Sequence, residues 1–154
     1  MGLQSSVGIT VGVSATLPTT HDDDATDGFP SLTFTACGKL NAAPPMTGTR
    51  DIANFDNLST GEEEKVLDVL RAGSGELTFG FDEDDAGQAI IETAADATTT
   101  AASTLAMEFT LPSGRIYYRL GIVTSYSPTG AIGSVMTAAA NVEFVKDHVK
   151  VDAA

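Results

Sequence analysis

Several residue types are scarce in this chain of 154 residues. Tryptophan is absent, the only cysteine is Cys37, and the histidines are His21 and His148. A single cysteine excludes an internal disulfide. Neither histidine lies in a segment that would hold a base rigidly against a serine or cysteine nucleophile. Cys37 stands between small residues and is predicted to pack in the interior. We therefore predict that the chain is not an enzyme.

Basic residues are also scarce. Eight lysines and arginines stand against 21 aspartates and glutamates, which gives a formal net charge of −13. Binding to nucleic acid requires lysine and arginine side chains that displace counterions from phosphates, and here the basic residues are scattered singly. No window approaches the ~18 apolar residues of a membrane span. We expect neither specific DNA binding nor a membrane partner.

The acidic segments do not form a convincing metal site. Residues 82–87, DEDDAG, resemble the start of a calcium-binding EF-hand loop, but Ala86 and Thr93 occupy positions where that loop needs oxygen ligands. Capping of a helix explains these carboxylates better. The acidic run at 21–24 reads as a solvated turn. We predict no metal and no cofactor.

The clearest structural signal lies at residues 75–96. Leu77, Phe79 and Phe81 alternate with polar or small residues, as in a half-buried strand. The period then changes to three and four, which is typical of an amphipathic helix. The sequence therefore predicts a strand followed by a helix, with Ile90 and Ile91 bracing that helix against a sheet.

The remaining periodic segments are predicted strands. They cover residues 7–13, 31–40, 105–111, 116–123 and 135–146, and Pro112-Ser113-Gly114 supplies a tight turn for a hairpin. We predict a single domain over 1–154 in the α+β class, mostly β. Its architecture would be a two-layer antiparallel β-sandwich or half-barrel with one flanking helix. Residues 1–6 would form an N-terminal arm and 147–154 a C-terminal tail.

Residues 41–62 are predicted to be a long loop, since Pro44-Pro45 and several turn-forming residues interrupt any strand pattern. Four apolar residues within it would act as anchors: Met46, Ile52, Phe55 and Leu58. They either fold back on their own domain or dock on another subunit. The following segment, 62–73, has local helix signals, namely three glutamates at its start and Gly73 at its end.

The order of these elements resembles the major tail tube proteins of long-tailed, lambda-like bacteriophages (siphoviruses). The likeness rests on ELTFGFDEDDAGQAII (76–91), FTLPSGRIYYRLGIVTSYSPTGAIG (109–133) and NVEFVKD (141–147). The region TRDIANFDN followed by EEEKVLDVLRAGSGEL also looks like that family's long loop. In the family, the part matching Lys65–Gly73 is usually extended, and this favours a strand over the local helix signals.

The resemblance implies a structural virion protein of a non-contractile tail. Subunits would form hexameric rings that stack into a hollow tube, assembled in the bacterial host cytoplasm. Partners would be other copies of the chain, the tape-measure protein in the bore, the tail tip and terminator proteins, and double-stranded DNA that passes without specific binding. Glu76 and Glu108, on the small-residue faces of their strands, are predicted to face the bore.

Another reading is a monomeric β-sandwich that serves as a binding or virion decoration module. The segment 41–62 distinguishes the two readings. Its apolar anchors need a neighbouring subunit in a tail tube, but only an intramolecular groove in a monomeric module.

Overall fold

The computed structural model describes residues 2–153. Its strands, in chain order, are β1 (Thr10–Ser14), β2 (Thr35–Cys37), β3 (Leu40–Ala42), β4 (Thr49–Asn57), β5 (Glu62–Arg71), β6 (Ser74–Gly80), β7 (Thr104–Thr110), β8 (Ile116–Thr129) and β9 (Thr137–Val151). The helices are α1 (Ala86–Ala95), the single turn α2 (Thr100–Ser103) and a short 3-10 segment, Phe29–Ser31. None of the described helices is long and apolar enough to cross a membrane.

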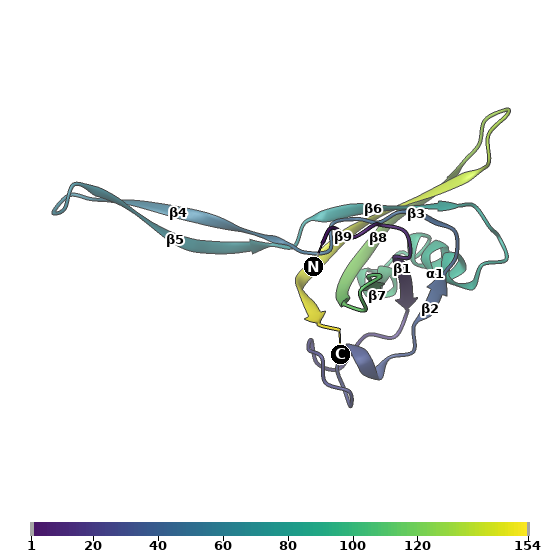
Figure 1. Ribbon diagram of the computed structural model, residues 1–154, viewed down its shortest axis with the longest axis horizontal. Coiled ribbons are helices and arrows are strands. Elements are labelled where there is room, and N and C mark those ends of the chain that lie inside the picture. Colours follow the sequence, from purple (N-terminus) through teal and green to yellow (C-terminus); the bar gives the residue numbers. More distant parts are fainter. Residues whose placement is uncertain (1, 154) are drawn as a thin grey trace.

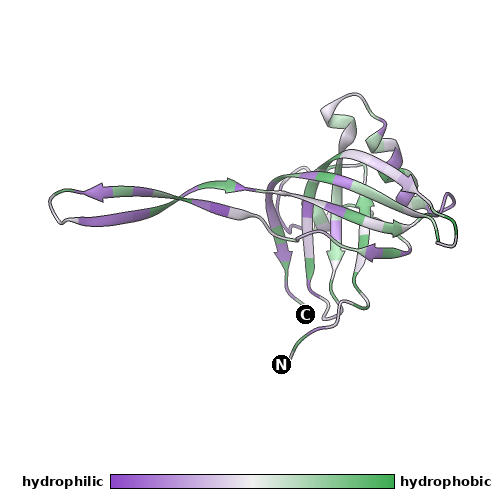
Figure 2. Ribbon diagram, turned by 90° about the horizontal axis from the view of Figure 1, so that it is seen from above, coloured by the Kyte–Doolittle hydropathy of each residue, from purple (hydrophilic) through white to green (hydrophobic). Residues whose placement is uncertain are grey.

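Seven strands form one antiparallel sheet in the order β2-β1-β7-β8-β9-β6-β3. Its two outermost strands, β2 and β3, are joined by Gly38 and Lys39 alone. Because three peptide steps span at most about 11 Å, the two edges of the sheet must lie near each other. The sheet is therefore curved into a half-barrel, as Figure 2 shows. The predicted class, mostly β with one flanking helix, is confirmed.

The concave side of this half-barrel holds the main core. Apolar residues that alternate along the strands fill it together with one face of α1: Val11, Val13, Leu77, Phe79, Leu105, Met107, Phe109, Val123, Val142 and Ile91. The predicted hairpin is confirmed, since β7 pairs with β8 from Thr104↔Ile122 to Thr110↔Ile116. The core thus follows directly from the two-residue period of the sequence.

Helix α1 is fixed at its start by polar contacts. Asp85 is the N-cap and accepts a hydrogen bond from the Gln88 backbone N–H at 3.0 Å, which confirms the predicted capping. The buried Gln88 side chain donates to the Gly38 and Gly80 carbonyls and accepts from the Tyr126 hydroxyl at 2.8 Å. The helix is thereby tied to β6, to β8 and to the link between the two sheet edges.

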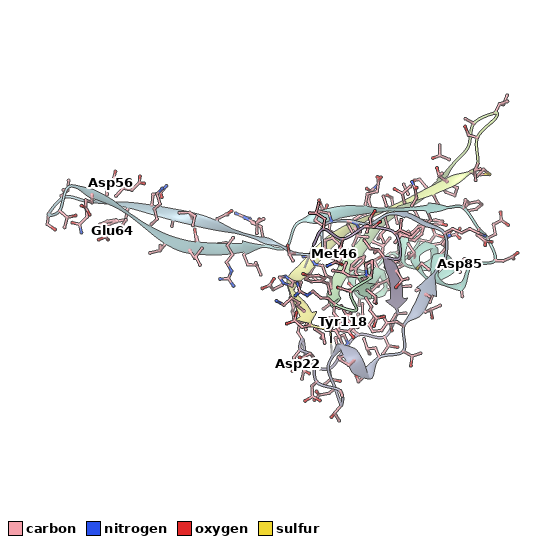
Figure 3. All side chains as sticks on the ribbon, in the orientation of Figure 1. Asp22, Met46, Asp56, Glu64, Asp85 and Tyr118 are labelled. Carbon is pink, nitrogen blue, oxygen red and sulfur yellow. The ribbon has the colours of Figure 1, made fainter. Side chains whose placement is uncertain are left out.

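Part of the convex side is covered by the segment before β2. Phe29 is fully buried there and stacks on Tyr118, with ring centroids 5.3 Å apart. Phe34 also packs against Tyr118. The His21 ring meets Phe29 edge-on, and its Nε2 lies 2.6 Å from the Asp147 carbonyl. The acidic run that begins at His21 thus belongs to an ordered loop, and Figure 3 shows Asp22 and Tyr118 on the same side of the body.

Strands β4 and β5 form a separate two-stranded sheet that projects far from the body; we call it the arm (residues 49–71) (Figure 1). One prediction was wrong here: residues 41–62 are not a loop, because β3 and β4 occupy much of the range. For residues 62–73 the two readings are now decided, since β5 is the strand that the family resemblance favoured and not the helix that the local signals indicated. Cross-strand pairing with β4 and the β-branched Val66 and Val69 outweigh the helix-capping signals, as the family resemblance indicated.

Two strand boundaries also differ from expectation. The C-terminal segment is not a free tail as far as Val151, because β9 continues and pairs with β8 up to Ile116↔Val151. A left-handed residue, Lys146 (φ 60°), interrupts the regular pattern just before this extension, which explains why the periodic signal stopped there. At the other end, β1 begins at Thr10, and Met1 and Ala154 lie outside the described residues.

Candidate assembly surfaces

The arm exposes apolar side chains to an unusual extent. Six large ones are more than half exposed, with Leu58 at 98% and Phe55 at 64%; the others are Ile52, Val66, Leu67 and Val69. Ile52, Phe55 and Leu58 had been predicted as anchors, whereas Val66, Leu67 and Val69 were missed because the helix signals obscured their strand. Figure 2 shows green, hydrophobic bands alternating with purple, hydrophilic ones along the arm.

Both faces of the arm carry apolar groups. Ile52 pairs directly with Leu67 on one face, while Ala53 pairs with Val66 on the other. Phe55 lies on the Val66 side, since alternate residues of a strand share a face. An isolated two-stranded hairpin is marginally stable in water at best. A second layer is needed on at least one face, and none of the elements within residues 2–153 supplies it.

Met46 behaves differently from the other three predicted anchors. It is half-buried and packs against the main core at the base of the arm, as Figure 3 shows. Of the two alternatives for this segment, folding back therefore applies to Met46. Ile52, Phe55 and Leu58 stay exposed and remain candidates for contact with another subunit.

Arg119 connects the two chain segments that join the arm to the body. Its guanidinium donates to the Pro45 carbonyl before the arm at 3.3 Å and to the Ala72 carbonyl after the arm at 2.7 Å. The guanidinium carbon also lies 3.9 Å from the centre of the Phe144 ring, a cation–π arrangement. We call this group the arm clamp (Pro45, Ala72, Arg119 and Phe144).

The clamp residue is almost completely buried, with 1% of its surface exposed. Burial lowers the pKa of Arg119 from its ordinary value, an effect that the charge of Asp147 opposes. An arginine nonetheless stays protonated in proteins. The sequence offered only a weak signal for this role: a single arginine in an otherwise apolar and aromatic strand. Its partners are carbonyls far away in the chain, so the clamp was not predicted.

A polar sheet face lies on the convex side of β6, β9 and the second half of β8, beyond the reach of the covering segment. Glu76, Asn141 and Glu143 are exposed on it, and Ser125 accepts a hydrogen bond from the Asn141 amide at 2.9 Å. Strand register places Glu76 opposite Asn141, and Asn141 opposite Ser125. The face carries two carboxylates and no basic residue at these positions.

Glu108 lies on the same side of the sheet as Glu76 but in a different setting. It pairs with Gly12 and Tyr118, under the covering segment, and is half-buried. Burial raises the pKa of Glu108, and a hydrogen bond from Tyr118 opposes that rise. Burial together with the Glu108 charge raises the pKa of Tyr118 to about 12, so its hydroxyl stays protonated. Glu76 is exposed to solvent, whereas Glu108 is half-buried.

Ile90 and Ile91, the two residues predicted to brace the helix, differ in burial. Ile91 is fully buried in the main core. Ile90 is only partly buried and lines a small apolar groove of about 240 Å³ between α1, α2 and the start of β7. Ile91 is thus the main contact that holds α1 to the half-barrel.

Cys37 is the one cysteine among the described residues, and it is buried. Burial, and secondly the charge of Asp85, raises the pKa of the Cys37 thiol to about 12, which suppresses the reactive thiolate. Within residues 2–153 no group of three or more histidine, cysteine or acidic side chains could hold a metal ion. The features that stand out are the exposed apolar arm and the polar sheet face.

Comparison with known proteins identifies no family for this chain. No protein-family model matches the chain, and no curated protein matches it. A solved structure titled "Structure of a type six secretion system protein" has a TM-score of 0.34 and 14% identity, over 90% of this chain and 79% of that one. A likeness of this size carries no argument about function.

Proposed function

We propose that this chain is the structural subunit of a tail tube of the long-tailed phage type. Copies would form rings, hexameric as the family resemblance implies, that stack into a hollow conduit for the tape-measure protein and later for DNA. Its partners would be its own copies and the proteins that cap the tube at the tip and the terminator end.

The arm is the observation that carries this proposal. It exposes six large apolar side chains on a hairpin that has no second layer. Apolar surface of this kind is a typical mark of a protein interface. The arm clamp fixes its base, so the direction in which the arm leaves the body is built into the fold. A contact between an arm and a different surface of the next copy is head-to-tail, which closes into rings or propagates as filaments.

The polar sheet face supports the idea of a conduit. Its carboxylates, Glu76 and Glu143, lack basic neighbours on that face. A surface without lysine or arginine makes no counterion-releasing contact with phosphates, so DNA would pass without sticking. We propose that this face lines the bore. Glu76 is better placed for that role than Glu108, which is covered within its own subunit.

The monomeric binding or decoration module is less well supported. That reading needs an intramolecular groove for the apolar anchors, and Ile52, Phe55 and Leu58 are instead 51%, 64% and 98% exposed. A monomer would leave the arm as a solvent-exposed apolar hairpin, which favours aggregation.

The direct test is the assembly state of the purified full chain. We expect rings or tubes in negative-stain electron micrographs and a shift to faster sedimentation as concentration rises. The double variant Phe55→Asp/Leu58→Asp should remain monomeric with an unchanged thermal unfolding midpoint. The matched control Thr98→Asp/Ser113→Asp adds the same charge at exposed positions on the body and should assemble like the parent protein.

Two results would overturn the proposal. One is a uniform monomer at every concentration, together with failure to assemble on a preformed tail tip. The other is normal tubes from the Phe55→Asp/Leu58→Asp variant. An electropositive bore in an assembled tube would refute the placement of the polar sheet face.

A further inference from the structure

A second projection leaves the body at the end opposite the arm. It is the turn between β8 and β9, residues 130–136, which we call the tip (Figure 1). Ile132 is fully exposed, Val135 is 81% exposed and Met136 is 47% exposed. Solvated turns rarely present three large apolar side chains together, so the tip calls for a physical explanation.

The tip has a defined shape. The Ser134 N–H donates to the Ala131 carbonyl at 3.1 Å, and Gly133 takes a left-handed conformation (φ 82°) that suits glycine. At the base, the Phe81 N–H donates to the Met136 carbonyl at 3.0 Å. A side chain at Gly130 would press on Met136, with the added carbon 3.1 Å from its Cγ. The tip is therefore a hydrogen-bonded turn of defined conformation that exposes its apolar side chains.

Charge makes the tip different from the rest of the surface. No charged residue occurs between Arg119 and Glu143, a stretch that includes the whole tip, although the chain carries a net charge of −13. Copies with that charge repel each other, and the repulsion is smallest where they meet through an uncharged surface.

The outer end of the arm has charge and apolar side chains that suit contact with an uncharged apolar surface. Its outer end carries four carboxylates, Asp56 and Glu62–Glu64, with Lys65 as the neighbouring basic residue, and Figure 3 labels two of them, Asp56 and Glu64. These acids disfavour an acidic docking partner, while the apolar side chains Phe55 and Leu58 beside them require an apolar one. The tip of a second copy satisfies both conditions.

From these observations we infer that the tip of one copy is the docking site for the arm of the next. The inference rests on the proposed assembly and specifies its contact surface. Because the arm and the tip project from opposite ends of the same chain, every copy offers one of each, as a head-to-tail interface requires. A tip-to-tip contact would instead be isologous and would stop at a dimer.

The test is a mixing experiment with two full-length variants, followed by sedimentation velocity over a concentration series. The arm variant is Phe55→Asp/Leu58→Asp, and the tip variant is Ile132→Asp/Val135→Asp. Each alone should be monomeric, with association weakened on the order of tenfold or more. Mixed, they should form a 1:1 heterodimer that does not grow, because the intact arm of one meets the intact tip of the other and both remaining ends are disabled.

Control variants keep the outcomes separate. Thr98→Asp/Ser113→Asp should assemble like the parent chain, and the milder tip variant Ile132→Ser/Val135→Ser should show a smaller loss with an unchanged unfolding midpoint. If the parent chain neither associates by itself nor assembles on a preformed tail tip, the proposed function itself fails. If the parent chain associates and the tip variant does so equally well, only the present inference fails. It also fails if the arm variant alone forms dimers, or if the mixture of both variants stays monomeric.

Discussion

The body and the arm are built from the same kind of strand but solve the burial of apolar side chains in opposite ways. In the body, alternate residues point into one core beneath a curved sheet, and α1 covers it. In the arm, apolar residues occur on both faces of two strands and nothing among residues 2–153 covers either face. The body is therefore a self-sufficient fold, whereas we propose that the arm is half of an interface.

The difference shows that exposure has to be judged by location. A large exposed apolar side chain on a wide protein surface is ordinary. Six on a projecting hairpin, anchored through one buried arginine, are the basis of our proposal that the arm contacts other copies. Four variants test whether body and arm are as independent as this comparison states.

The largest effect is expected for Ile91→Asp. It buries a carboxylate in the main core under α1, at a position with no surface exposed. We expect a loss of about 4 kcal/mol or more in the free energy of unfolding, measured by urea denaturation. Ala89→Asp, on the exposed side of the same helix, is the control and should change stability by less than about 0.5 kcal/mol. Ile90→Asp should lie between the two, and equal effects at all three positions would contradict the placement of the helix.

Arg119→Met tests the connection between the two regions. The variant leaves the Pro45 and Ala72 carbonyls without their donor, and we expect a loss of about 2–4 kcal/mol. Hydrogen exchange of the arm amides should accelerate more than that of β7. Arg119→Lys keeps the charge but not the forked geometry, so it should rescue only part of the stability. Uniform acceleration across the body would show that Arg119 stabilises the core rather than the arm.

Replacement of residues 49–71 by a four-residue Gly-Ser linker removes the arm altogether. Because the arm adds nothing to the core, we expect the free energy of unfolding to stay within about 1 kcal/mol of the parent value, while assembly is lost. Circular dichroism and thermal unfolding of the shortened chain measure the first expectation, and electron microscopy measures the second. Collapse of the body would mean that the arm is part of its fold.

The smallest effect is expected for Glu108→Gln. Burial raises the pKa of Glu108 above its ordinary value of 4.5, so the folded chain holds this proton more tightly than the unfolded chain does. The stabilising contribution of the protonated form is fully present below pH 4.5 and is lost as the pH rises through the raised pKa. The variant should therefore be slightly more stable than the parent at pH 7, by less than about 1 kcal/mol given its partial exposure.

The same measurement at about pH 3.5 supplies the control for Glu108→Gln, because the parent side chain is then neutral and the advantage should vanish. Glu76→Gln, at the exposed position on the same side of the sheet, removes one negative charge without relieving burial and should gain less stability at pH 7. An equal gain at both positions would indicate general charge repulsion rather than burial.

The predictions were most accurate in segments where one hydrophobic period, of 2 or 3.6 residues, runs through the whole segment. Leu77 and Phe79, the Asp85 cap and the β7–β8 hairpin followed from local pattern alone, since burial on one side of a strand or helix leaves a period of 2 or 3.6. The local signals misled at 62–73, where three glutamates and a terminal glycine mimicked a helix. Cross-strand pairing with residues 49–57 decided that segment, and a helix pattern sought within 62–73 alone does not include that partner strand.

The sequence by itself determined the mostly-β class, the one substantial helix with its cap, the interior placement of Cys37, and the apolar anchors Ile52, Phe55 and Leu58. Only the tertiary structure decided where those anchors lie. It placed Met46 against the core and the others on a projecting arm. It also brought Arg119 to the carbonyls of Pro45 and Ala72, and it left Glu76 exposed while Glu108 is half-buried. These are properties of contacts between residues far apart in the chain, which local periodicity does not encode.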